Sequence, residues 1–313
     1  VVAQEKSDTL STAAVSTVSG DDLYHIQASN LSNTWAGMLP GLTVLQGNGA
    51  VGYDNAQWII RGVGSYGSGT WNSAKIFVDG FEVNSEYLVS LSPSEIESIS
   101  VLKDGAALAI YGDRGANGVI RIETKRGKIG PATVSAKVRY GATTPNIINK
   151  PLNSYDFANL YNQAVSNDNG RVWSPFYNAE QLEAYASGKG VDVDWYDEVL
   201  RDAGSYVDGD VIFNGGNENA RYNVSLSYLN TQGLFNTRNT DSTKNLGYER
   251  YNIRANLDFN ILQIFEFRVD FNGRIEQRRR PNYGVTDLFS DLAKTPSNAY
   301  NIYDNEEKTH LSG

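Results

Sequence analysis

The feature that most constrains the fold of this chain is a regular alternation of apolar and polar residues in its second half. The clearest example interleaves five apolar with five polar residues: Tyr251, Ile253, Ala255, Leu257 and Phe259 with Asn252, Arg254, Asn256, Asp258 and Asn260. The pattern recurs at 133–140, 221–228 and 265–276, and more weakly at 207–213. Alternation sustained over five positions is a strong signal for a β-strand with one apolar face. We therefore expect about five antiparallel strands in residues 131–313.

Two environments produce strands of this kind. In a soluble β-sandwich the apolar face packs into the core and the polar face meets water. In an outer-membrane β-barrel the apolar face meets lipid and the polar face lines a water-filled bore. The alternation alone leaves both open, and a secreted, soluble β-sandwich protein that binds carbohydrate or mediates adhesion is the competing class.

The placement of aromatic residues favours the barrel. Tyr251 and Phe259 stand at the two ends of one apolar row, and Tyr222 and Tyr228 at the ends of another. Eight residues span about 26 Å along a strand, or roughly 20 Å across a membrane when the strand tilts by about 40°. This approaches the apolar band of about 25 Å that aromatic girdles flank in outer-membrane barrels. A sandwich core gives no reason for aromatic residues at both strand ends.

The lengths of the connections also favour the barrel. After the first strand they run long (142–206), short (214–219), long (231–250) and short (261–263). Outer-membrane barrels have short periplasmic turns and longer extracellular loops, so we expect the two long connections to be extracellular. Five strands cannot close a barrel, and lipid does not tolerate an open sheet edge. We therefore expect the chain to be the amino-terminal part of a longer polypeptide.

The first 130 residues follow a different plan. Residues 1–20 are small and polar, which predicts a mobile lead-in, and a short helix is expected within 21–39 before Pro40-Gly41 ends it. Short strands and small helices are then expected, the strands at 42–45, 57–61, 75–78, 99–102 and 119–125 and the helices near 94–97 and 106–111. These elements predict one compact α+β domain over residues 21–130.

Composition excludes several functions. The chain has 27 Lys and Arg against 36 Asp and Glu, a net charge of −9, which argues against nucleic-acid binding. It has no Cys, which excludes thiolate sites, and its two histidines, His25 and His310, have no triad-like companions. Glu95 and Glu97 lie on a short polar helix end, where we expect them to be solvated. We find no catalytic arrangement and no metal-ligand spacing, so we expect neither an enzyme nor a cofactor.

A series of short motifs runs through the first domain: Leu39-Pro40-Gly41-Leu42-Thr43-Val44, Ile60-Arg61-Gly62-Val63-Gly64-Ser65, Val78-Asp79-Gly80, Ile99-Ser100-Val101-Leu102-Lys103-Asp104, Ile110-Tyr111-Gly112 and Ala116-Asn117-Gly118-Val119-Ile120. In order and spacing, over about 100 residues, these motifs resemble the plug of TonB-dependent outer-membrane transporters, and more narrowly the SusC/RagA family of the Bacteroidetes. Residues 155–163 and the strand pair near 207–232 resemble the first barrel segments of that family.

The resemblance implies an α+β plug domain inside a transmembrane β-barrel of about 22 strands, in the outer membrane and surrounded by its lipid. It also implies a SusD-like lipoprotein lid over the extracellular mouth, and import of an oligosaccharide or a peptide. Energy is expected from the TonB–ExbB–ExbD complex, which pulls on a TonB box ahead of the plug. Val1-Val2 fits the tail of such a box, but no complete box is present.

Two sets of candidate residues follow. Charged residues next to glycine or at strand ends could form polar contacts with a surrounding barrel wall. A plug in a water-filled bore needs such polar contacts, because an apolar contact could not be released. With the neighbouring motif residues, this wall-contact set is Arg61, Gly62, Asp79, Gly80, Lys103, Asp104, Tyr111, Gly112, Asp113, Arg114, Asn117 and Gly118. If the chain runs up and down through the plug, the turns after Leu45 and Gly80 point outward. Their polar and aromatic residues form an apical set that could hold a polar ligand or could be ordinary loop residues: Gln46, Asn48, Tyr53, Asn55, Glu82, Asn84 and Tyr87.

Overall fold

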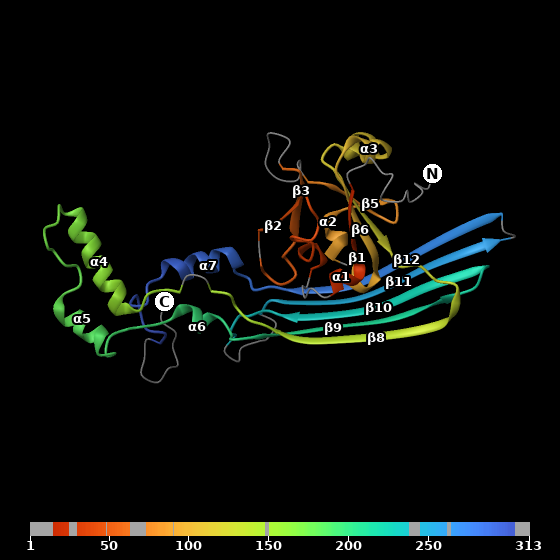
Figure 1. Cartoon of the computed structure of the whole chain (residues 1–313). Coiled ribbons are helices and arrows are strands. Elements are labelled where there is room, and N and C mark those ends of the chain that lie inside the picture. Colours follow the sequence, from red (N-terminus) through yellow and green to blue (C-terminus); the bar gives the residue numbers. More distant parts are fainter. Residues whose placement is uncertain are drawn as a thin grey trace. The chain divides into compact units, whose positions relative to one another are not determined.

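Five long strands in the second half of the chain form one sheet, which we call the long sheet. They are β8 (Gly130–Thr143), β9 (Gly204–Gly216), β10 (Ala220–Gln232), β11 (Gly247–Ile261) and β12 (Phe265–Arg279). Each strand lies beside its neighbours in sequence, and β10 is antiparallel to both β9 and β11 (Figure 1). The structure, a computed structural model, thus confirms the antiparallel strands that the alternation predicts.

The structure describes residues 15–24, 30–47, 49–62, 73–89, 91–147, 150–237, 245–261 and 264–303. The chain divides into two compact units. The first comprises residues 1–141, 205–232 and 247–278, and so joins the first domain to the long sheet. The second comprises residues 142–204, 233–246 and 279–313. No helix among the described residues is both long and apolar enough to cross a membrane.

The central strands of the long sheet, β10 and β11, are buried on their polar face and more exposed on their apolar face. On β11, the side chains of Arg254 and Asn256 are 2% and 0% exposed, whereas Tyr251 is 50% exposed. On β10, Ser225 is 1% exposed and the adjacent Leu226 is 43% exposed. This is the reverse of a soluble sandwich, in which the apolar face packs into the core.

Residues 15–129, which we call the N-terminal domain, contain a mixed five-stranded sheet in the order β1-β6-β7-β4-β5 and a separate hairpin, β2–β3. The strands are β1 (Val15–Ser19), β2 (Leu42–Gln46), β3 (Ala56–Ile60), β4 (Lys75–Val78), β5 (Phe81–Val83), β6 (Ile96–Leu102) and β7 (Val119–Thr124). Only β4 and β7 pair in parallel among the registered strand pairs of the described residues. The core between the sheet and the hairpin includes Trp35, Trp58 and Ile99, all at most 2% exposed.

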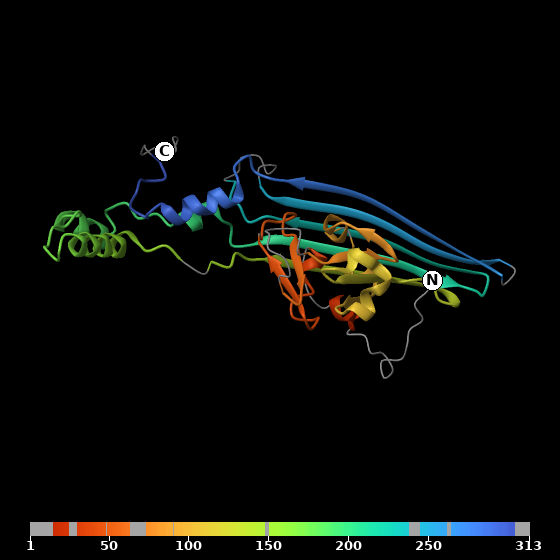
Figure 2. The ribbon, with the colours of Figure 1, turned by 90° about the horizontal axis from the view of Figure 1, so that it is seen from above.

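Short helical segments connect these strands. They are α1 (Gly20–Tyr24), η2 (Leu31–Asn33), α2 (Ser85–Val89), η4 (Pro93–Glu95), α3 (Gly105–Leu108) and η5 (Ala109–Gly115). The domain lies against one face of the long sheet, as the views in Figures 1 and 2 agree.

The second unit contains four helices among its described residues: α4 (Ser154–Asp168), α5 (Ala179–Ala186), α6 (Trp195–Val199) and α7 (Val285–Lys294). An aromatic cluster joins α4 to α5, with the rings of Tyr161 and Phe176 5.2 Å apart and those of Tyr177 and Tyr185 6.1 Å apart. Asn162 fixes the connection, because its amide accepts from Tyr177 N and donates to Tyr177 O, both at 2.8 Å.

Three expectations need correction. Residues 15–19 form β1, paired with β6, and not part of a mobile lead-in; residues 1–14 lie outside the described residues. Of the helix expected within 21–39, the described residues 21–24 and 30–39 contain part of α1 and the single turn η2, which Asn30 caps before the chain turns at Gly37, with a φ of 77°; residues 25–29 lie outside the described residues. Residues 155–163, which lie in a segment expected to be a long loop, belong to α4, a helix that Asn153 caps.

Candidate functional site

The contact between the N-terminal domain and the polar face of the long sheet centres on Glu95, which is 1% exposed at the end of η4. Its carboxylate accepts from Asn252 Nδ2 at 2.8 Å and from Arg254 Nε at 3.2 Å. Burial raises the pKa of Glu95, and the Arg254 guanidinium opposes that rise. A buried carboxylate is costly unless it is paired, so this ion pair holds the domain in register with the sheet.

Arg254 joins three segments of the domain. Besides Glu95, it donates from Nη2 to Tyr87 Oη at 2.8 Å, and its Nη1 lies 4.0 Å from Asp79 Oδ2. Asp79 also accepts from Thr124 N at 2.9 Å and Thr124 Oγ1 at 2.7 Å. One guanidinium on β11 therefore organises the turn after β4, the helix α2 and the start of β6.

Hydrogen bonds and ion pairs continue on both sides of this centre. Toward β9, the hydroxyls of Ser92 and Ser94 donate to Asp210 Oδ1 at 2.9 and 2.7 Å. Toward the end of the sheet where β9 ends and β10 begins, Arg126 donates to both carboxylate oxygens of Asp270 at 2.9 and 2.8 Å, and to Asp258 Oδ1 at 2.6 Å. Burial opposes the charge on Arg126, but the hydrogen bonds to Asp270 prevail and raise its pKa.

A different kind of contact lies at the other end of the sheet, from which residues 144–203, 233–246 and the chain after 279 depart. We call this the long-loop end. Here Val51 of the β2–β3 turn packs on a small apolar cluster of Tyr206, Leu229 and Tyr248. The guanidinium carbon of Arg278 lies 5.8 Å from the ring centre of Tyr53 and 5.7 Å from that of Tyr248.

The predicted wall-contact residues have varied positions. Asp79 reaches the long sheet through Arg254. Lys103 donates to Ser16 Oγ, Asp104 caps α3 by accepting from Ala107 N at 2.9 Å, and the ring of Tyr111 packs on Phe77. These three contacts are internal to the N-terminal domain.

The remaining members of the wall-contact set are mostly at turns. Arg61 and Asp113 are exposed, Asn117 is half-buried, and Arg114 pairs with Glu82 at 3.4 Å. A positive φ is shared by Gly62, Gly80, Gly112 and Gly118. Gly118 has a φ of 85°, which favours glycine, and a Cβ there would also crowd the Ile60 side chain, at 2.6 Å from Cδ1.

The structure does not bring the apical set together. Tyr53 lies beside Arg278, whereas Tyr87 accepts from Arg254 and from Asn272 Nδ2 and so belongs to the contact with the sheet. Asn272 and Arg278 are six residues apart on β12, about 20 Å along the strand. The other members are an exposed Gln46, Asn55 bonded to Asn30, Glu82 paired with Lys75, Asn84 capping α2 through Tyr87 N, and Asn48, which lies outside the described residues.

Sequence reasoning missed the main contacts. Glu95, expected to be solvated, is buried, because a partner 159 residues away covers it. The sheet side of the contact was indicated by the polar rows of the strands. A row rich in charged and amide residues must meet either water or a polar surface. The structure shows that the N-terminal domain supplies that surface.

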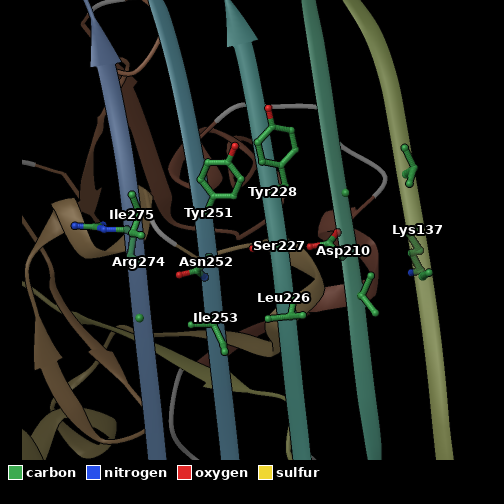
Figure 3. Close-up of a pocket in the computed structure, with 15 residues that line it drawn as sticks. Lys137, Asp210, Leu226, Ser227, Tyr228, Tyr251, Asn252, Ile253, Arg274 and Ile275 are labelled. Carbon is green, nitrogen blue, oxygen red and sulfur yellow. The ribbon is translucent and has the colours of Figure 1, made fainter.

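The apolar face of the long sheet carries a shallow depression of about 730 Å³ lined mainly by apolar side chains. In Figure 3, Tyr228, Tyr251, Leu226 and Ile253 lie on this face, while Ser227 is directed to the opposite side of the strands. The rings of Tyr228 and Tyr251 are 4.8 Å apart across the β10–β11 pair. Among the residues that the structure describes, no cluster of His, Asp and Glu could hold a metal ion.

Comparison with known proteins gives these features a context. Residues 8–119 match the family model described as TonB-dependent Receptor Plug Domain. Over 313 residues the chain is 29% identical to TonB-dependent receptor SusC of Bacteroides thetaiotaomicron, covering 96% of this chain and 28% of that protein. Over 271 residues it is 31% identical to TonB-dependent receptor P3 of Formosa agariphila, covering 86% and 24%. The chain thus spans about a quarter of the length of these relatives.

Among solved structures, the chain is similar to one described as the RagAB peptide importer in the 'open-open' state. The TM-score is 0.74 and the sequence identity 23%, over 96% of this chain and 34% of that one. This likeness establishes the fold, a plug followed by the first antiparallel strands of a barrel wall.

Proposed function

The chain belongs to the SusC/RagA family of TonB-dependent receptors, and on that premise we propose that the whole protein imports a nutrient across the bacterial outer membrane. The nutrient class is an oligosaccharide or a peptide, and the solved relative described as a peptide importer supports the second. A SusD-like lipoprotein partner and energy from TonB are part of the proposal. The relatives are receptors, so we propose no catalytic role.

The observation that carries the proposal is the reversed burial of the long sheet. Its polar face is covered by a folded domain that contacts it through Glu95, Arg126 and Ser94, and its apolar face is exposed. Exposed apolar rows suit acyl chains, and a covered polar face suits a water-filled bore that must stay shut at rest. A soluble sandwich would instead bury the apolar rows against a second sheet.

The same geometry supports an assignment of the segments. We place residues 15–130 in the plug, because β1 pairs with β6, 131–313 in the barrel wall with its loops, and the residues ahead of β1 near the TonB-box region. The long connections, residues 144–203 and 233–246, leave the sheet at one end and would face the cell exterior, because barrels of this kind have long loops on that side. The plug turn at residues 50–53, which lies at the long-loop end, would then face an arriving ligand.

Uptake measurements test this function. Cells that express the full-length receptor and its SusD-like partner are given labelled oligosaccharides and labelled peptides, with and without a functional TonB. We expect one of the two classes to accumulate only when TonB is active, and we expect the receptor to require detergent for extraction. TonB-independent accumulation, or recovery of the protein in buffer without detergent, would exclude the proposal.

A further inference from the structure

A carboxylate lies at the edge of the apolar face of the long sheet. Glu249 is near the start of β11, at the long-loop end, and its side chain is on the same face as that of Tyr251. Its Oε1 accepts from Tyr251 Oη at 2.8 Å and from Tyr228 Oη at 3.1 Å. Within the described part of the chain these two hydroxyls are its hydrogen-bond partners, and Oε2 has none.

The two tyrosines also line the depression on this face, and so connect it to the carboxylate. In Figure 3 both tyrosine hydroxyls point away from Leu226 and Ile253, which line the depression farther from the long-loop end. The depression therefore has an apolar floor and one polar end, which is formed by Glu249.

A glycine on β9 makes room on one side of the tyrosine pair. Gly209 is the cross-strand partner of Tyr228 and lines the depression. A Cβ at Gly209 would meet no atom closer than 3.7 Å, so the described structure would accept a side chain there. Glycine in the interior of a strand often marks a place where a ligand comes close to the backbone.

A second glycine deepens the depression on the other side. Gly273 of β12 also lines it, and a Cβ there would lie 3.0 Å from Ile253 Cγ2. The strands β9 and β12 flank the β10–β11 pair, so each of the two glycines replaces a side chain at one margin of the depression. Its volume of about 730 Å³ is within the range of roughly 300–1,000 Å³ that is usual for ligand pockets.

The chemistry of the depression selects among lipids. Lipid tails are as apolar as leucine, so an acyl chain gains little by moving from the bilayer to an apolar surface, and only close packing and polar contacts can hold it. The depression offers packing, and Glu249 offers a negative charge at its polar end. A carboxylate attracts an ammonium headgroup and repels a headgroup that is only anionic, and it does so more strongly beside apolar surface than in water.

We propose that this depression binds phosphatidylethanolamine, with an acyl chain between Gly209 and Gly273 and the ammonium group on Glu249 Oε2. The inference goes beyond import and rests on the membrane placement proposed above. The bound lipid stays on the receptor while the surrounding lipids exchange.

Native mass spectrometry of the full-length receptor tests the proposal. The receptor is purified in detergent, stripped of lipid and placed in nanodiscs with equal amounts of phosphatidylethanolamine and phosphatidylglycerol that carry the same acyl chains. Gly209→Val fills the depression, and Glu249→Gln removes the charge but still accepts from the tyrosine hydroxyls. Ala255→Val is the matched control, because it adds bulk to the same face of β11 outside the depression. Only receptor with heat-modifiable migration, and hence a folded barrel, is compared.

We expect the unmodified receptor and Ala255→Val to retain phosphatidylethanolamine several-fold more than phosphatidylglycerol. Gly209→Val should lose the retained lipid, and Glu249→Gln should retain the two lipids about equally. Equal retention by the unmodified receptor would overturn the proposal, as would an unchanged preference in Glu249→Gln, which leaves the depression intact. Retention of lipopolysaccharide in place of phosphatidylethanolamine would also overturn it. Extraction of the receptor without detergent would instead count against the membrane placement.

Discussion

At the scale of single residues, the closed state depends on a few buried polar groups that satisfy one another. Glu95 has Arg254 and Asn252, and Arg254 in turn has Tyr87. Because the partners come from two different parts of the fold, removing one leaves a buried charge on the other side. We therefore expect the removal of Arg254 to weaken this contact strongly.

The substitution Arg254→Gln should loosen the plug by about 3 kcal/mol near neutral pH, because it leaves the Glu95 carboxylate buried without its cation. Since burial raises the pKa of Glu95 and Arg254 opposes that rise, the variant has an even higher pKa at this carboxyl. The protonated form is then favoured in the folded state. The loss should be small below about pH 4.5, where the carboxyl is protonated in both states, and should grow as pH rises through the raised pKa.

Hydrogen exchange of residues 96–102 in the full-length receptor measures this loss, expected as an exchange rate about 100-fold faster near neutrality. Arg268→Gln is the control, because its side chain on β12 is half exposed. An Arg254→Gln variant that exchanges like the control, or whose deficit grows at acidic pH, would contradict the role given to this ion pair.

At the scale of elements, the strands and the helices differ in how well the sequence predicts them. The alternation of apolar and polar residues predicts β10 and β11. One face of a barrel strand meets lipid and the other meets the polar interior along the whole strand. The helices α4, α5 and α6 were missed within a segment expected to be loop, although Asn153, Asn178 and Asp194 are readable N-caps. The burial of Glu95 could not be predicted, since nothing local to η4 indicates a partner on β11.

The α4–α5 pair gives a test of element stability. Asn162→Ala removes two hydrogen bonds to the Tyr177 backbone and leaves that half-buried peptide group without these partners. We expect a local loss of about 2 kcal/mol, measured as faster proteolysis or hydrogen exchange across residues 154–186. Gln163→Ala, next to it on the exposed side of α4, should change little. Equal protection in both variants would show that the aromatic cluster alone holds the pair.

The apolar face of the long sheet gives a second test. Leu226→Arg places a charge near the middle of β10 and should impair insertion into a bilayer by about 2–4 kcal/mol. Tyr140→Arg, near the long-loop end of β8, should cost at most about 1 kcal/mol, because the penalty falls toward the membrane surface. Folding yields in vesicles, followed by heat-modifiable migration on a gel, measure both. If the two variants fold equally well, this face does not contact lipid.

At the scale of the whole molecule, the N-terminal domain packs against a sheet that a later part of the chain forms. The plug has its own core around Trp35 and Trp58, and the wall contributes polar partners and the apolar cluster on which Val51 packs. The plug can therefore keep its internal structure while its contacts with the wall change. Stability of the fold and readiness to open are set by separate groups of residues.

This separation predicts an order of exchange within the plug. β1 is an edge strand that pairs only with β6, whereas β6 and β7 each have two neighbours. In hydrogen-exchange measurements on the full-length receptor, amides of residues 15–19 should exchange before those of residues 96–102 and 119–124. Simultaneous exchange of all three strands would mean that the plug opens as one cooperative block.

The edge position of β1 has a mechanical consequence. A force on the amino end of the plug acts first on β1, the edge strand of its sheet. The five residues of β1 are held in the sheet by pairing with β6. The hydrogen bonds between β1 and β6 can break one after another from the amino end. A weak, sustained force therefore suffices, whereas breaking all of them at once would require a large force. If TonB pulls on this end, as proposed above, a short displacement is enough to begin, and the hydrogen bonds to β6 can re-form when the force ceases.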